Sequence, residues 1–193
     1  MTHDLVAIGT SWGGLAALRT ILGGLPAGLD AAVIVAQHRA PESHPHAFRD
    51  LLGAVTPLKV REPVDKQAIE AGTVYVAAPD YHLLVERDSL ALSTDEPLMY
   101  ARPSIDVLLE SAAEAYRARC VGVVLTGANA DGARGLARVA ELGGTTIVQD
   151  PAGAERDEMP LAALAAVPNA RVAGVDGIAS LLVELCGLAR VAV

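Results

Sequence analysis

The sequence predicts a three-layer, doubly wound α/β fold, with a mostly parallel sheet and an appended antiparallel hairpin. Strand-like and helix-like segments alternate along the 193 residues, which is typical of parallel sheets covered by helices on both faces. The strand-like segments are continuous apolar runs rich in valine and alanine, as expected for strands buried on both faces. Since the chain has 52% hydrophobic residues and no repeat or linker, we expect one domain over residues 1–193.

The expected elements follow one another in a regular order. A first strand at residues 5–8 leads into a helix whose apolar residues recur at helical spacing over residues 15–22. Further strands are expected at residues 31–36, 58–61, 73–77, 120–125, 145–149 and 171–175. Further helices are expected at residues 44–52, from Arg102-Pro103-Ser104 to residue 116, then up to residue 142, at 160–166 and at 177–188. Pro103 is expected at the first helical position, and residues 82–86 and 89–93 form the hairpin around Arg87-Asp88.

Charge, hydropathy and cysteine content exclude several classes of protein. Fifteen basic and 23 acidic residues give a net charge of −8, so we expect no nucleic-acid partner. No apolar run reaches the length of about 18 residues that a membrane span needs, so we expect no membrane insertion. The first residues lack a secretory signal pattern, and a cytoplasmic location is expected. Cys120 and Cys186 lie in apolar patterns and are expected to be buried, reduced thiols.

Three loops that follow expected strands carry side chains that can take part in catalysis: Ser11, His38 and Asp131. Each has an ordinary explanation, because serine and aspartate often cap helices and a loop histidine can be a surface residue. Asp131 could simply cap the helix that begins at Gly132. Together, however, the three supply the hydroxyl, imidazole and carboxylate of nucleophilic acyl transfer at one edge of a sheet. The glycine-rich turn after Ser11 could supply N–H groups to an oxyanion.

Two other kinds of site are disfavoured by the same residues. A dinucleotide-binding turn would have glycine in place of Ser11 and an acidic residue where Gln37-His38 ends the second expected strand. We therefore expect no cofactor. His44 and His46, with His38 nearby, suggest a metal site, but no HExxH pattern or cysteine pair supports it, and no metal is expected.

Five motifs in register carry a family resemblance. They are IGTSWGG at residues 8–14, QHRAP at 37–41, YVAAPDYH at 75–82, RPSIDVL at 102–108 and LTGANADGA at 125–133. From about Leu5 to Leu185 the sequence resembles the catalytic domain of the chemotaxis protein-glutamate methylesterases, the CheB family. The resemblance implies hydrolysis of glutamyl γ-methyl esters on the cytoplasmic helices of methyl-accepting receptors, with release of methanol, and often deamidation of receptor glutamines.

The resemblance also implies roles for particular residues. Ser11 corresponds to the nucleophile, His38 to the general base and acid, and Asp131 to the carboxylate that orients the histidine. Trp12 and Ala128 occupy the oxyanion and active-site wall positions. Arg102 would lie near the mouth of the site as a candidate for substrate binding, with a structural salt bridge as the alternative.

The sequence also departs from the family pattern. Ala128 stands where methionine is usual, and Asn129 stands where glycine is usual, which could alter the backbone that sets an oxyanion donor. The chain begins directly with the catalytic strand, so a phosphorylated receiver domain is not expected in cis. These features suggest a stand-alone homologue that acts on a receptor-like or sensor protein. The alternative is a catalytically weak module that binds a receptor or a receptor methyltransferase.

Overall fold

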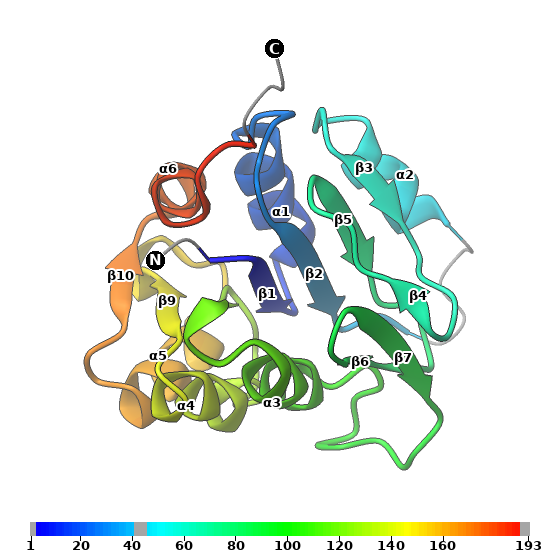
Figure 1. Ribbon diagram of the computed structural model, residues 1–193. Coiled ribbons are helices and arrows are strands. Elements are labelled where there is room, and N and C mark those ends of the chain that lie inside the picture. The colour runs from blue at the N-terminus through cyan, green and yellow to red at the C-terminus, as the bar shows by residue number, and fades with distance from the viewer. Residues whose placement is uncertain (1–2, 41–45, 190–193) are drawn as a thin grey trace.

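The computed structural model describes residues 3–40 and 46–189, which form an alternating series of strands and helices (Figure 1). The strands are β1 Leu5–Thr10, β2 Ala32–Gln37, β3 Lys59–Arg61, β4 Gln67–Ala68, β5 Thr73–Val76, β6 His82–Val85, β7 Ser89–Ser93, β8 Cys120–Val124, β9 Thr145–Gln149 and β10 Arg171–Ala173. The helices are α1 Gly14–Gly23, α2 Ala47–Gly53, α3 Ile105–Tyr116, α4 Ala133–Glu141, α5 Glu158–Ala166 and α6 Val175–Cys186, with short 3₁₀ turns at Arg117–Arg119 and Pro151–Gly153.

The main sheet has seven parallel strands in the order β10-β9-β8-β1-β2-β5-β3. From the central strand β1 the chain first adds β2, the edge strand β3 and then β5 between them, and later builds in the other direction through β8, β9 and β10. The order therefore reverses beside β1, and such a reversal opens a crevice beyond the carboxyl ends of the central strands. The loops after β1, β2 and β8 meet at this crevice, as the sequence predicts.

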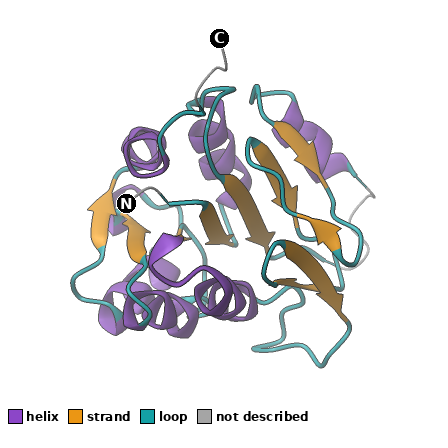
Figure 2. Ribbon diagram, in the orientation of Figure 1, coloured by secondary structure: helices purple, strands orange, loops and turns teal. Residues whose placement is uncertain are grey.

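Helices cover both faces of this sheet, so the expected three layers are confirmed (Figure 2). One core lies between the sheet and α1, α2 and α6, and a second lies between the sheet and α3, α4 and α5. Within the described residues, β1 and β2 are buried along their entire length. This burial on both faces explains why these strands have no alternating polar positions.

A smaller antiparallel sheet extends the second core. The predicted hairpin forms, with β6 pairing β7, but a third strand, β4, pairs the other edge of β7. Leu83, Val85 and Leu90 of this sheet are buried in the same core as α3. The expectation of a two-stranded hairpin is therefore incomplete, because a strand as short as β4 has no periodic pattern that a sequence could reveal.

The start of α3 differs from the prediction. Pro103 is not the first helical residue, since the helix begins at Ile105 and Ser104 is its N-cap, whose hydroxyl accepts a hydrogen bond from the N–H of Val107. Smaller shifts occur at α2, α5 and α6, which begin at Ala47, Glu158 and Val175. Across residues 3–40 and 46–189, the helices are too short or too polar to cross a membrane.

Candidate active site

Ser11 follows β1 directly and lies outside helix α1. Its N–H donates to the carbonyl of Thr126 at 3.0 Å, and its own carbonyl accepts from the N–H of Gly14 at 3.0 Å. The N-cap of α1 is Gly13, so the alternative explanation of Ser11 as a helix cap is wrong. Ser11 instead lines a cavity of about 560 Å³ together with His38.

His38 follows β2 at the same edge of the sheet. The strand register pairs Thr10 with Gln37, which sets Ser11 and His38 beside each other at the ends of their strands. The side chain of Gln37 donates from Nε2 to the carbonyls of Ser11, at 2.7 Å, and His38, at 3.1 Å. The His38 side chain is 14% exposed, and its Nε2 lies 2.8 Å from Oδ2 of Asp131. With Nε2 paired in this way, Nδ1 is the ring nitrogen left to receive a proton.

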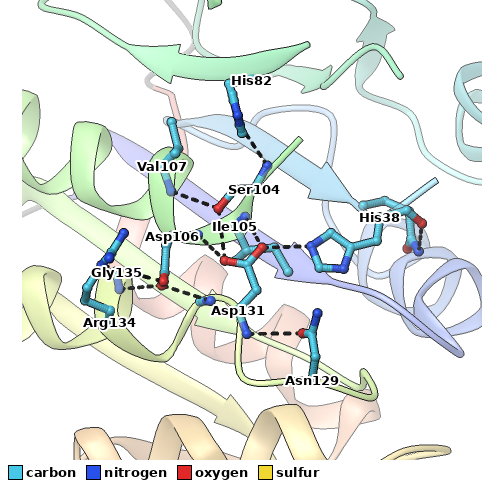
Figure 3. A network of polar contacts seen from close by, with 12 residues as sticks. His38, His82, Ser104, Ile105, Asp106, Val107, Asn129, Asp131, Arg134 and Gly135 are labelled. Atoms are coloured by element: carbon cyan, nitrogen blue, oxygen red, sulfur yellow. Dashed lines mark hydrogen bonds and ion pairs between the residues drawn. The ribbon is translucent and has the colours of Figure 1, made fainter. Parts of the chain in front are cut away.

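Asp131 ends the loop after β8 and is almost completely buried, with 1% of its surface exposed. Its Oδ2 accepts from His38 Nε2 and from the N–H of Ile105, both at 2.8 Å. Its Oδ1 accepts from the hydroxyl of Ser104 at 3.0 Å and from the N–H of Asp106 at 2.9 Å (Figure 3). Burial raises the pKa of Asp131, but the hydrogen bonds from His38, Ile105 and Asp106 outweigh it, so the pKa lies below the ordinary value of an aspartate. The carboxylate is therefore ionised at neutral pH and fixed in orientation.

Helices α3 and α4 cap each other through two carboxylates. Asp131 precedes α4, yet its carboxylate accepts from the N–H groups of Ile105 and Asp106 at the start of α3. In return, Oδ1 of Asp106 accepts from the N–H groups of Gly132 at 2.9 Å and Gly135 at 2.8 Å at the start of α4. The N-cap of α4 is Gly132, with φ 99° and no side chain to cap with. The alternative explanation of Asp131 as the cap of α4 is therefore wrong.

The pKa values of the two carboxyl groups in this reciprocal cap shift in opposite directions. Burial raises the pKa of the Asp106 carboxyl, and the charge of Asp131 adds to the increase. The N–H groups of Gly135 and Gly132, and the Arg134 guanidinium 3.7 Å away, oppose that increase. Each negative charge lies at the positive end of a helix, which makes two buried anions tolerable so close together.

Backbone N–H groups border Ser11 on two sides. Within the described residues, the N–H groups of Trp12 and Ala128 donate no hydrogen bond. The Ala128 loop passes close to the serine, because a Cβ added to Gly127 would lie 3.0 Å from Cβ of Ser11. The Thr126 hydroxyl donates to the carbonyl of Trp12 at 2.9 Å and so joins the two loops. The arrangement provides candidate donors for an oxyanion.

The side chains at these positions differ in what they do. The Trp12 ring is 60% exposed and lines the Ser11 cavity, while its Nε1 donates to Glu155 Oε1 at 2.8 Å. Ala128 is exposed and offers only backbone. Asn129 does not take a positive φ, and its Oδ1 accepts from the N–H of Asp131 at 3.1 Å. The replacement of glycine at this position therefore imposes no left-handed backbone.

Arg102 forms a structural salt bridge with Asp80, which is the alternative to substrate binding that the sequence leaves open. Its Nη2 lies 2.6 Å from Oδ1 of Asp80, and its Nη1 donates to the carbonyls of Thr94 at 2.9 Å and Asp95 at 3.0 Å. It also lines a second cavity, of about 360 Å³, which it shares with His38. Contact between Arg102 and a substrate stays a prediction.

The histidines that suggested a metal site do not form one in the described part of the chain. His44 lies outside the described residues, and His46 pairs its Nδ1 with Oε2 of Glu62 at 2.7 Å. In residues 3–40 and 46–189, no group of three or more potential metal ligands is found. Cys120 and Cys186 are free and buried, as predicted.

Comparison with known proteins identifies the family. The sequence model of the CheB methylesterase family matches residues 6–182. The chain belongs to the CheB methylesterase family. The crystal structure of the Thermotoga maritima CheB methylesterase catalytic domain superposes on this CheB-family chain with a TM-score of 0.90 at 30% identity, covering 96% of this chain and all of that one.

Curated relatives of this CheB-family chain fall into two length classes. A Leptospira interrogans protein is 41% identical over 186 residues, which is 96% of each chain. A Cupriavidus pinatubonensis protein, named protein-glutamate methylesterase/protein-glutamine glutaminase 1, is 40% identical over 94% of this chain and 53% of its own length. The name of the Leptospira protein gives the same two activities, as a provisional assignment.

Sequence reasoning missed the residues that support the predicted CheB-family triad. Gln37 was considered only as the end of a strand, and Ser104 and Asp106 only as parts of a helix start. The available signal was a serine and an aspartate two residues apart at a helix N-terminus, where side-chain oxygens commonly accept backbone N–H groups. That signal does not reveal that the partner helix is α4.

Proposed function

We propose that this chain is a serine hydrolase that demethylates glutamyl γ-methyl esters on a methyl-accepting receptor or sensor protein. The observation that carries the proposal is that His38, which pairs with the buried, ionised Asp131, lines the same cavity as Ser11. The relatives named for both activities support the same reaction on glutamine side chains. The proposal includes a cytoplasmic location, because the resemblance implies substrates on receptor cytoplasmic helices.

In the proposed mechanism, the Ser11 hydroxyl attacks the γ-carbonyl carbon while Nδ1 of His38 takes its proton. Asp131 stabilises the resulting imidazolium through Nε2, and the N–H groups of Trp12 and Ala128 stabilise the oxyanion. Collapse of the tetrahedral intermediate breaks the bond to the methoxy group, which leaves as methanol with the proton from His38. Water, activated by the same histidine, then hydrolyses the acyl-enzyme to glutamate. For a glutamine side chain, the leaving group is ammonia.

The test is methanol release from a methyl-esterified receptor cytoplasmic fragment. We expect Ser11→Ala to abolish release, because the variant lacks the hydroxyl that forms the acyl-enzyme in the proposed mechanism. Ser180→Ala, an exposed serine on α6, is the matched control and should retain full activity. Full activity in Ser11→Ala would overturn the mechanism.

Two alternatives give different results in the same assay. A binding module without turnover is not favoured, because Asn129 leaves the loop backbone ordinary and the named relatives are enzymes. Such a module, docking on a receptor or methyltransferase, would release no methanol and would fail to label at Ser11 with a fluorophosphonate. A small-molecule esterase would hydrolyse p-nitrophenyl acetate but not the receptor fragment.

A further inference from the structure

A tight turn beside the proposed active site has an unusual sequence. Leu98 and Ala101 exchange two backbone hydrogen bonds, at 3.1 and 2.9 Å, around Met99 and Tyr100. Both central residues have positive φ, 50° and 64°. Positive φ at both positions defines a type I′ turn, which strongly prefers asparagine, aspartate and glycine. Methionine and tyrosine therefore hold an unfavourable backbone conformation here, and such outliers cluster at functional positions.

The two side chains of this turn point into solvent rather than into the core. Tyr100 is fully exposed, at 104% of its reference surface, and Met99 is 52% exposed. Among the exposed large hydrophobic residues in the described chain, Tyr100 has the highest exposed fraction. Tyr100 therefore adds no stability by burial and Met99 is only half-buried, so core packing does not explain their presence.

The turn is nevertheless held in place by the scaffold. It belongs to the connection from β7 to α3, which projects from the molecule in Figure 1. Arg102 binds the carbonyls of Thr94 and Asp95 just before the turn. His82 Nε2 contacts the carbonyl of Glu96 at 3.2 Å, and its Nδ1 accepts from the N–H of Ser104, which in turn binds Asp131. A fixed display of apolar side chains loses little freedom on binding a partner.

Position explains what the turn can reach. Met99 and Tyr100 line the 360 Å³ cavity with His38, and Trp12 lines the 560 Å³ cavity with Ser11 and His38. Because His38 borders both cavities, exposed apolar side chains flank the proposed reaction site on two sides. A single glutamyl methyl ester fits within the Ser11 cavity alone and would leave the turn without a contact. A longer polypeptide that enters the site would meet the turn.

The charge balance of the two cavities differs from that of the whole chain. Three arginines, Arg19, Arg39 and Arg102, and two carboxylates, Asp80 and Glu155, line them. The whole chain has the opposite balance, with 15 basic and 23 acidic residues. Within the described residues, however, Arg102 pairs with Asp80 and Arg39 lies 3.8 Å from Glu62, so the cleft is close to neutral and repels an acidic receptor segment less than the rest of the molecule does.

We infer that the Met99-Tyr100 turn is a docking element that packs on apolar side chains of the polypeptide that bears the ester. This inference rests on the proposed function, and it assigns substrate recognition to residues outside the triad. Met99 and Tyr100 act on binding of the polypeptide and take no part in bond breaking. Arg102 and His82 act indirectly, by holding the turn.

The test compares a protein substrate with a small ester. The double variant Met99→Asn, Tyr100→Gly removes both apolar side chains and installs the preferred type I′ sequence, so the turn and the fold are retained. Val172→Ala, an exposed apolar residue on β10, is the matched control. For the methyl-esterified receptor fragment, we expect kcat/KM of the double variant to fall about 30-fold, mainly through KM, as for loss of an aromatic interface anchor. Hydrolysis of p-nitrophenyl acetate should stay within about twofold of wild type, as should both activities of Val172→Ala.

Each other outcome has a definite meaning. A double variant that processes the receptor fragment like wild type, or that loses both activities equally, overturns the inference and leaves the proposed function intact. A wild-type chain that hydrolyses p-nitrophenyl acetate but not the receptor fragment overturns the proposed function and the inference with it. A concentration-dependent wild-type dimer that the double substitution dissolves assigns the turn to self-association and overturns docking of substrate.

Discussion

Replacement of Asp106 tests whether the reciprocal cap holds the site together. Asp106→Ala removes the acceptor for two buried N–H groups, those of Gly132 and Gly135. Hydrogen bonds to a charged group contribute about 1.5–3 kcal/mol each. Because burial already disfavours the charged form of Asp106, as its raised pKa indicates, the net loss of unfolding free energy should be less than their sum, about 2–4 kcal/mol.

The matched variants separate the buried contact from surface electrostatics. Asp106→Asn keeps an oxygen acceptor and should lose less than half as much stability as Asp106→Ala. Glu110→Ala breaks the ion pair with Arg134, at 2.5 Å, which joins the same two helices at the surface. An exposed pair of this kind contributes about 0–1 kcal/mol, so this variant should be nearly as stable as wild type.

Urea unfolding followed by circular dichroism measures these differences, and methanol release measures the effect on the site. Since Asp106 fixes the N–H of Gly132 next to Asp131, we also expect kcat to fall about 10- to 100-fold in Asp106→Ala, through misplacement of the carboxylate that orients His38. An unfolding free energy of Asp106→Ala within about 0.5 kcal/mol of wild type would refute the capping argument. A loss in Glu110→Ala as large as in Asp106→Ala would refute it too.

Four further results are expected. Asp131→Asn should lower kcat on the order of 10⁴-fold by favouring the wrong histidine tautomer, and a smaller loss would contradict the orienting role. Because the pKa of Asp131 is lowered in the folded chain, its stabilisation is present above the ordinary pKa of a carboxyl group and is lost as the pH falls through the lowered value, so the urea midpoints of wild type and Asp131→Asn should converge in strong acid. Gln37→Ala should lower kcat about tenfold with little change in KM. An unchanged kcat would show that the two hydrogen bonds from Gln37 to backbone carbonyls are dispensable. Burial raises the pKa of Cys120 to about 12 and of Cys186 to about 11, so iodoacetamide should label these thiols only after denaturation, and rapid labelling of the native chain would show that they are accessible.

The sequence predicted the parts of this fold that depend on local pattern. The apolar strands and their alternation with helices suffice to predict a parallel sheet, and a parallel sheet brings the ends of its strands to one edge. Ser11, His38 and Asp131 could therefore be grouped before any coordinates were known. The pairing of His38 with Asp131 at 2.8 Å agrees with that grouping.

The parts that were missed depend on which segments become neighbours. β4 is two residues long and is a strand only because its backbone pairs with the free edge of β7. Pro103 has the right chemistry for a first helical position, but Ser104 next to it is the better N-cap, and its hydroxyl is also needed by Asp131. Nothing local to Asp106 indicates that its carboxylate serves a different helix.

The reciprocal cap explains why the carboxylate of the proposed triad can be so deeply buried at little cost to the fold. A buried anion is expensive unless hydrogen bonds compensate for the lost water. Asp131 obtains that compensation from the N-terminus of α3, which would itself need an acceptor for its first N–H groups. The same bonds that complete helix α3 therefore orient the carboxylate towards His38. It follows that the proposed site and the scaffold share the same hydrogen bonds, because the two carboxylates are the acceptors for N–H groups at the starts of α3 and α4.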